Sequence, residues 1–298
     1  MRHRFLAIAM ASAILPCPGA GAEGGASTAP TLAQLRSARV RGLFDGKTVQ
    51  LKGGVYEGPP YEPGGASRPR AQLLRRLTAT GDLDGRPGEE RLVFLSASTG
   101  GSGEDILLAA FGLRKGKVEN LGTALVGNRV KLRGLAVDGR TVILDVLEAG
   151  PKDAMCCPTQ LARRSYRLEA GMLAEVGNEV TGTLSLATVS GAEWTLDEMD
   201  GKPLPKGARP PTLQVGDGAV FGFGGCNRYR GGIEERTPGS VSVGKLASTM
   251  MACVEPQTSL ETRFLRELAL VGSYTFLEGR LALLWEEGGQ RGVLLFRR

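Results

Sequence analysis

Short apolar runs, each about as long as a β-strand, follow one another from residue 43 to residue 176. Turn signals separate them, and Lys115-Gly116, Asp138-Gly139 and Ala170-Gly171 stand where hairpins need residues with positive φ. The pattern predicts an antiparallel β meander that forms a first domain over residues 23–177. Its expected strands are VQLKGGVYEG (49–58), RLVFLSAS (91–98), ILLAAFGL (106–113), VENLGTAL (118–125), RVKLRGLAV (129–137), TVILDVLEAG (141–150) and RSYRLEAG (164–171).

A second block of apolar runs fills the C-terminal third of the chain. It is separated from the first by a stretch of low charge, NEVTGTLSLATVS, at residues 178–190. We interpret this stretch as a linker and residues 191–298 as a second domain. The expected strands of the second domain are WTLDEM (194–199), PTLQV (211–215), AVFGF (219–223), SVSVG (240–244), SYTFL (273–277), LALLW (281–285) and GVLLF (292–296).

One segment of the second domain has the periodicity of a helix. Thr258 is followed three residues later by Glu261, a spacing that predicts a capping box at the start of the helix. The fold class expected for the whole chain is therefore mainly β, with α+β character in the second domain. The apolar face of the helix consists of Leu260, Phe264, Leu265, Leu268 and Val271.

The first residues have the layout of a secretory signal peptide. A positively charged start is followed by an apolar run at residues 5–15, and the small residues after it end at Ala22. Because this run is too short to span a bilayer, we expect residues 1–22 to be cleaved and the mature protein to be periplasmic or secreted. No later apolar stretch has the length of a transmembrane segment. Cys17 offers a site for lipid attachment, but the preceding Pro16 disfavours a lipoprotein.

Charge and composition argue against several classes of function. The formal net charge is only +6, and no basic run is interleaved with aromatic residues that could stack on bases, so nucleic acid is not an expected partner. The only histidine, His3, lies in the predicted signal peptide. The mature chain therefore lacks the side chain on which Ser-His-Asp catalysis and many zinc sites depend. Carboxylate chemistry remains open, and Asp197, Glu198 and Asp200 are the candidates for a hydrolase.

Four cysteines remain after the predicted cleavage: Cys156, Cys157, Cys226 and Cys253. An even number in an oxidising compartment favours disulfides, and four cysteines allow three pairings. A Cys226–Cys253 bond would close a long loop, whereas Cys156 and Cys157 could form a vicinal disulfide, stay reduced or bridge outward. A redox site would need a C-x-x-C spacing, which is absent. We interpret the cysteines as structural.

A segment that resembles part of a calcium loop lies at residues 81–90, GDLDGRPGEE. Asp82 and Asp84 occupy the first and third ligand positions of such a loop. Arg86 stands at the fifth position, where an oxygen ligand is needed, and Pro87 replaces the expected glycine. We therefore interpret the segment as a charged turn, and no metal or other cofactor is predicted.

Several motifs of the C-terminal third occur in a fixed order: EWTL (193–196), GKP (201–203), GGCNRYRG (224–231), STMMACVEPQ (248–257), the predicted helix and VLLFRR (293–298). Together they resemble the META domain family (HslJ-like) over about residues 191–298. The motif residues are Gly225, Asn227, Thr249 and Met251. Met250 departs from the pattern, since the family often has arginine at this position. Any role that this arginine has in the family is therefore not expected in this protein.

The resemblance implies a small α+β fold, an open barrel-like sheet with one helix. It implies that Asn227 forms a turn in which its side chain bonds local backbone, and that Cys226 and Cys253 hold neighbouring segments together. It also implies envelope or secreted proteins linked to stress resistance, as in heat shock, or to secretion, with no known catalytic activity. The first domain has only a loose likeness to uncharacterised secreted bacterial proteins, which carries no function.

Three functions follow from these patterns. The leading hypothesis is an exported, non-enzymatic protein that binds a partner in the cell envelope. The alternative is a carrier for a lipid or another apolar small molecule, with Phe221, Phe223, Phe276 and Leu283 as lining residues. The third hypothesis is the hydrolase that uses carboxylates.

Overall fold

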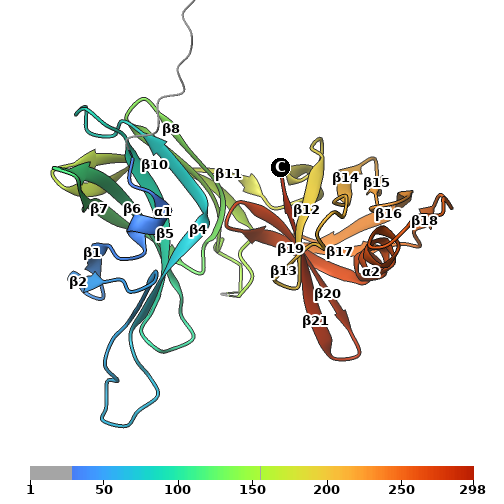
Figure 1. Cartoon of the computed structure of the whole chain (residues 1–298), viewed down its shortest axis with the longest axis horizontal. Coiled ribbons are helices and arrows are strands. Elements are labelled where there is room, and N and C mark those ends of the chain that lie inside the picture. Colours follow the sequence, from blue (N-terminus) through green and yellow to red (C-terminus); the bar gives the residue numbers. More distant parts are fainter. Residues whose placement is uncertain (1–28, 155) are drawn as a thin grey trace, which may run out of the picture.

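The computed structural model describes residues 29–154 and 156–298. The predicted signal peptide, Cys17 and His3 lie outside the described residues. Figure 1 shows two β-rich bodies that lie side by side, with the N-terminal half of the chain in one and the C-terminal third in the other. The longest helix among the described residues has 13 residues, and none of their helices has the length and apolarity needed to cross a membrane.

The N-terminal body is built from antiparallel strands that pair in chain order, so the predicted meander is confirmed. A short helix α1 (Leu32–Leu35) and the hairpin of β1 (Arg39–Leu43) and β2 (Lys47–Gln50) come first. A five-stranded sheet follows, made of β3 (Val55–Glu57), β4 (Arg70–Gly81), β5 (Glu90–Ser98), β6 (Asp105–Arg114) and β7 (Lys117–Asn128). A four-stranded sheet completes the body, with β8 (Lys131–Asp138), β9 (Thr141–Glu148), β10 (Gln160–Glu169) and β11 (Met172–Thr183).

Strands β5 and β6 are buried on both faces, which explains their nearly continuous apolar sequences. Side chains alternate between the two faces of a strand. Phe94 and Leu108 therefore enter one core, which they share with residues of β8, β9 and β10. Val93 and Ala109 enter a second core, under α1, β1 and β2. The five-stranded sheet is thus the middle layer of this body.

The turns at Lys115-Gly116 and Ala170-Gly171 have positive φ at both residues, as their sequences predict. The predicted linker, in contrast, is strand in its first half, because β11 continues to Thr183 and pairs with the start of β10. The residues in the second half of β11 are all exposed. Since no apolar alternation marks an exposed strand, only the backbone pairing to β10 reveals it. A short 3₁₀ turn, η1 (Leu186–Thr188), follows.

The C-terminal body is an eight-stranded barrel. The resemblance implied an open sheet, but the first strand pairs with the last from Thr195↔Arg297 to Met199↔Leu294, and this pairing closes it. Every strand predicted in this region is present. The barrel strands are β12 (Trp194–Met199), β14 (Thr212–Gly216), β15 (Ala219–Phe223), β16 (Arg228–Thr237), β17 (Ser240–Val243), β19 (Val271–Leu277), β20 (Arg280–Glu287) and β21 (Gln290–Arg297), with the short β13 (Lys202–Pro203) and β18 (Ala247–Ser248) beside them.

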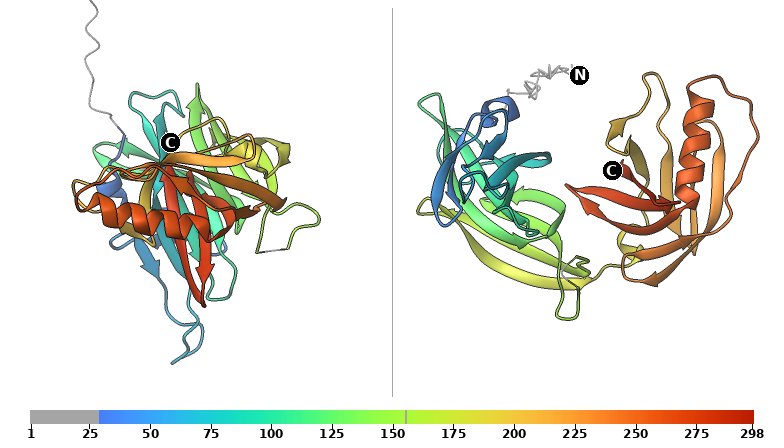
Figure 2. Two further views of the ribbon diagram at one scale, coloured as in Figure 1. Left: turned by 90° about the vertical axis from the view of Figure 1, so that its right-hand side faces the viewer. Right: turned by 90° about the horizontal axis from the view of Figure 1, so that it is seen from below.

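Helix α2 (Gln257–Ala269) packs Leu260, Phe264 and Leu268 of its predicted apolar face against the barrel, and Figure 2 shows it lying along the strands. Val271 was predicted on the same face, but it lies in β19 because the helix ends two residues earlier. Phe264 is fully buried and makes edge-on ring contacts with Tyr229 and Phe296. The space that remains inside the barrel is about 10 Å³, roughly the size of one water molecule at most. The interior is therefore a packed core, which argues against a carrier that would hold an apolar ligand inside the barrel.

The predicted capping box at the start of α2 is wrong. Pro256 is the N-cap residue and makes no capping bond with its side chain, and the N–H of Ser259 donates to the Glu255 carboxylate at 3.4 Å. The Thr258 hydroxyl instead donates to the Cys253 carbonyl at 2.8 Å. Glu261 lies two residues beyond the N3 position that a capping box requires, and its carboxylate binds the backbone of Cys226 and Asn227 instead.

The two bodies touch along β4, β8, β12 and the turn between β19 and β20. The Glu278 carboxylate accepts from the backbone N–H of Arg76 at 2.9 Å, and the N–H of Gly279 donates to the Leu132 carbonyl at 3.0 Å. The side chain of Leu147, from β9, belongs to the barrel's core. The contact between the bodies thus combines backbone bonds, ion pairs and apolar burial.

Raising the pH above about 10 is expected to destabilise the N-terminal body, because burial raises the pKa of Tyr166 from 10.0 to about 12. The pKa of Tyr166 is lower in the unfolded chain than in the folded protein. Its contribution to the free energy of unfolding is therefore complete below the pKa of the unfolded chain, and it declines as the pH rises towards the pKa of the folded protein. The loss approaches about 2–3 kcal/mol near pH 12. Thermal unfolding followed by circular dichroism measures this loss of stability.

The variant Tyr166→Phe should reduce the loss of stability at alkaline pH. The control Tyr61→Phe, at an exposed position, should leave that loss unchanged. Equal pH profiles for the two variants would contradict the assignment.

Candidate functional site

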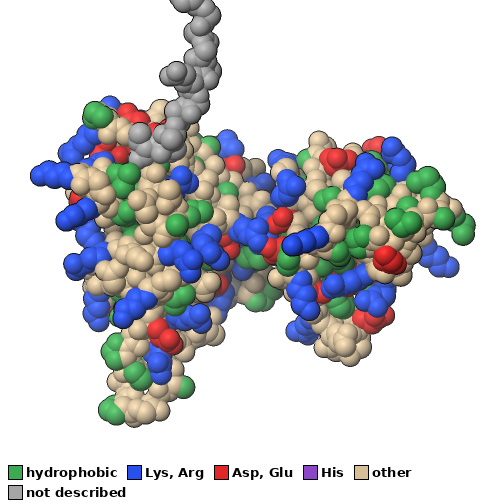
Figure 3. All heavy atoms as spheres, in the orientation of Figure 1, with side chains coloured by type: hydrophobic (Ala, Val, Ile, Leu, Met, Phe, Trp, Pro, Cys, Tyr) green, Lys and Arg blue, Asp and Glu red, His purple; other side chains and the backbone are tan. Residues whose placement is uncertain are grey.

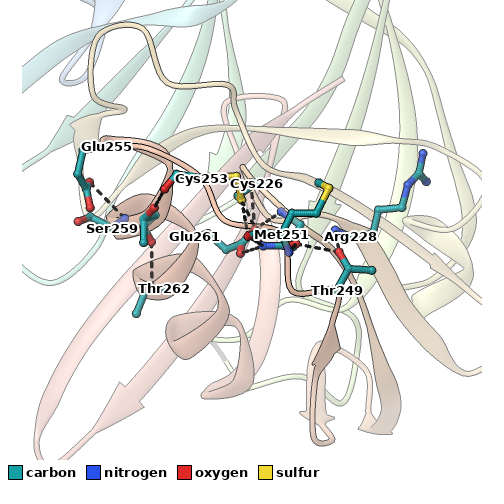
Figure 4. Close-up of a disulfide and its surroundings, with 11 residues drawn as sticks. Cys226, Arg228, Thr249, Met251, Cys253, Glu255, Ser259, Glu261 and Thr262 are labelled. Carbon is teal, nitrogen blue, oxygen red and sulfur yellow. Dashed lines mark hydrogen bonds between the residues drawn. A yellow bond between two sulfur atoms is a disulfide. The ribbon is translucent and has the colours of Figure 1, made fainter.

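The motif residues of the C-terminal third converge on the buried side chain of Asn227, which follows β15. Its Oδ1 accepts from the Thr249 hydroxyl at 2.9 Å and from the Met251 N–H at 2.7 Å. Its Nδ2 donates to Glu261 Oε1 at 2.8 Å and to the Met251 carbonyl at 3.3 Å. Figure 4 shows Thr249, Met251 and Glu261 gathered beside the disulfide. One amide therefore ties the residue after β18, the segment before α2 and α2 itself to the β15–β16 turn. The implied bond of this side chain to local backbone is wrong, because the backbone and side-chain oxygens that it reaches come from residues distant in the chain.

The glycines before Cys226 make room for the Glu261 carboxylate. Its Oε2 accepts from the backbone N–H of Cys226 at 3.0 Å and also from that of Asn227. A Cβ atom on Gly224 would lie 2.7 Å from the same oxygen, and Gly225 has φ +116°. The sequence GGCN is thus a turn whose backbone wraps around a carboxylate from the helix.

The disulfide between Cys226 and Cys253 closes this arrangement, with 6.1 Å between the two Cα atoms. We call Cys226, Asn227, Thr249, Met251, Cys253 and Glu261 the Asn227 cluster. Its polar side-chain groups bond to one another or to the backbone of the cluster. The cluster therefore positions segments, and its hydrogen-bonding groups are already used in doing so.

An open cleft of about 720 Å³ lies next to the Asn227 cluster, on the outer face of β14, β15 and β16. Pairing of β15 with β16 sets Phe221 opposite Arg230 and Phe223 opposite Arg228. The Arg230 guanidinium lies 5.3 Å from the centre of the Phe221 ring, and that of Arg209 lies 4.1 Å from the centre of the Phe223 ring. We call this the arginine cleft; its lining includes Arg209, Thr212, Gln214, Phe221, Phe223, Arg228, Arg230 and Met251.

The arginine cleft is positively charged. Within residues 29–154 and 156–298, none of Arg209, Arg228 and Arg230 lies within ion-pairing distance of a carboxylate. The acidic lining residue, Glu193, accepts from Gln214 at 3.0 Å. Figure 3 shows hydrophobic side chains gathered at the end of the molecule where β18 lies, with lysine or arginine nearby. Met250, two residues after β18, is 97% exposed.

The sequence patterns did not predict strand β16, which carries Arg228 and Arg230 of the arginine cleft. Its sequence, RYRGGIEERT, is rich in charge and glycine, so no apolar run marks it. The available signal was alternation, because buried Tyr229 stands between exposed Arg228 and Arg230. Strand pairing, and not any single basic run in the sequence, places these arginines beside the aromatic residues of β15.

The predicted calcium-like segment is paired with a cation from β6. Carboxylate oxygens of Asp82, Asp84 and Glu90 all lie within 4.8 Å of one another. The Arg114 guanidinium reaches both Glu90, at 3.1 Å, and Asp84. Asp82 accepts from the N–H of Gly85 at 2.6 Å. A guanidinium therefore neutralises the acidic group in the place where a calcium ion would be needed.

Cys156 and Cys157, both exposed, are bonded to each other in the loop between β9 and β10. This pair does not bridge to the C-terminal body, so of the three alternatives the structure has the vicinal disulfide.

The candidate hydrolase carboxylates are paired with arginines. Arg280 Nη1 lies 3.2 Å from Asp197 and 3.1 Å from Glu198. The Arg76 side chain reaches the same two carboxylates from the N-terminal body. Asp200 binds Arg263 and accepts from the N–H of Val293. Each of the three carboxylates therefore has a structural partner.

Comparison with known proteins identifies the C-terminal body. Residues 187–297 match the META domain family. An NMR structure of a protein from Burkholderia xenovorans is 26% identical, with a TM-score of 0.32, and the match covers 38% of this chain and 85% of that one. A second NMR structure is 22% identical, with a TM-score of 0.31, and covers 38% of this chain and 94% of that one. No curated protein matches the chain.

Proposed function

We propose that this protein, whose residues 187–297 form a META domain, is an exported, non-enzymatic protein that binds a partner in the cell envelope. The role that we propose for this binding is in envelope stress resistance or secretion. The signal-peptide pattern and the two disulfides support export. The observation that carries the binding role is the arginine cleft, an open surface beside the Asn227 cluster whose arginines form no ion pair with any carboxylate of the described residues.

Binding fits the arrangement of groups better than catalysis does. The polar groups of the Asn227 cluster are engaged in holding β16 and α2 together. The carboxylates at residues 197, 198 and 200 are neutralised by arginines. In contrast, the arginines of the cleft are exposed and have no acidic partner among the described residues, and a surface with an excess of positive charge attracts a partner of opposite charge.

The carrier hypothesis receives less support. Phe276 and Leu283 belong to the packed core of the barrel, which leaves about 10 Å³ inside. Phe221 and Phe223 lie outside, on the cleft, where guanidinium groups stack on their rings. An apolar ligand would therefore have to bind an open and positively charged surface.

A photo-crosslinking residue at Gln214, on the wall of the cleft, tests the proposed function in cells. Irradiation should produce an adduct of one defined mass, recovered in the envelope or secreted fraction. The matched control places the same residue at Val180, which is 59% exposed on β11 of the other body, and no such adduct should form there. Adducts from both positions or from neither would refute the binding role, and recovery of the protein in the cytoplasm would refute export.

A further inference from the structure

The basic residues of the arginine cleft have a regular spacing. Arg228 and Arg230 are two positions apart on β16, with buried Tyr229 between them. Their side chains therefore leave the same face of the strand, roughly 7 Å apart along it. Side chains on one face of an extended peptide have the same repeat. A ligand in strand conformation can thus present charges in register with both arginines.

The contacts with phenylalanine rings orient two guanidinium groups so that they can bind carboxylates. Arg209 and Arg230 lie over Phe223 and Phe221, at 4.1 and 5.3 Å from the ring centres. A guanidinium stacked on a ring keeps its N–H groups in its own plane, where they can form paired bonds with a carboxylate. With three arginines and one glutamate among the lining residues, the charge of the cleft is +2 (3 − 1).

An apolar rim adjoins the charged part. Met251 lines the cleft and is 62% exposed. Met250 and Val254 are exposed at 97% and 81% in the same segment, which is anchored by the Cys226–Cys253 bond. Exposed methionines adapt to apolar groups of different shape and are frequent at binding surfaces.

We infer that the arginine cleft binds an extended acidic segment of a partner protein, with carboxylates at alternate positions and an apolar residue beside them. This inference rests on the proposed function and names the chemistry of the partner. Single-stranded nucleic acid fits less well, because bases need free ring faces to stack, and a guanidinium already lies over each phenylalanine. A membrane surface fits less well, because the arginines line a hollow.

Fluorescence anisotropy of two labelled peptides on the purified protein tests this inference. One peptide alternates glutamate with valine, and the other has the same composition with its glutamates grouped. The alternating peptide should bind more tightly. The double change Arg228→Gln with Arg230→Gln should weaken its binding about tenfold. The matched control is Arg236→Gln, an exposed arginine on the same strand that does not line the cleft, and it should change the affinity less than about twofold.

Equal binding of the two peptides, or equal effects of the cleft and control variants, would overturn the inference. Tighter arginine-dependent binding of oligothymidylate, or of vesicles of phosphatidylglycerol and phosphatidylethanolamine, would overturn it as well. If a crosslinked adduct forms at position 214 but the alternating peptide does not bind, the proposed function stands and this inference fails. If the peptide binds as expected and no adduct forms in cells, the inference stands and the proposed function fails.

Discussion

Replacing Asn227 with alanine is expected to lower the free energy of unfolding of the barrel by about 2–4 kcal/mol, because buried partners lose their bonds. The change removes the acceptor of the Thr249 hydroxyl and the Met251 N–H, and a donor to the Glu261 carboxylate. Urea unfolding followed by tryptophan fluorescence measures the effect on the barrel alone. Both tryptophans of the chain, Trp194 and Trp285, are buried there.

The matched control for this prediction is Asn178→Ala, at an exposed position of β11. It should change the stability by no more than about 0.5 kcal/mol. A second variant, Asn227→Asp, would place a carboxylate beside Glu261 and should also destabilise the barrel. A barrel that keeps its full stability in Asn227→Ala would show that the hydrogen bonds of the Asn227 cluster contribute little.

Removing the Cys226–Cys253 bond by replacing both cysteines with serine is expected to destabilise the barrel by about 3–4 kcal/mol. The bond spans 27 positions of sequence. A bond of this span lowers the conformational entropy of the unfolded chain, and this effect stabilises the folded state by about 3–4 kcal/mol. The same tryptophan signal reports the change. The variant should also increase protease cleavage in the segment before α2, since the bond anchors it to the β15–β16 turn.

The control replaces Cys156 and Cys157 with serine. Their bond links adjacent residues, so it restricts the unfolded chain little, and we expect a change of at most about 1 kcal/mol. Comparable destabilisation by the two double variants would contradict the argument from loop length. Unchanged stability without the Cys226–Cys253 bond would mean that the hydrogen bonds of the Asn227 cluster suffice to hold the segment.

The predictions from sequence succeeded where the signal is local. The alternation and length of the apolar runs predict β5, β6 and all seven strands foreseen in the second domain, because the side-chain period of a strand is written in neighbouring residues. The same reasoning failed at β16 and at the end of β11, whose exposed residues carry no apolar period. The capping box failed for a related reason, since the spacing of Thr258 and Glu261 is compatible with a cap but does not require one.

The sequence by itself determined the β-rich class, the meander, most of the helix face and the resemblance of the C-terminal third to the META domain family, because each depends on short-range patterns. Only the tertiary structure decided that the second sheet closes, and that Glu261 binds the backbone 34 positions earlier. The arginine cleft also required it. Its cations and rings come from β15, β16 and the segment before β14, and strand pairing alone brings them to one face. Contacts between residues distant in the chain leave no periodic trace in the sequence.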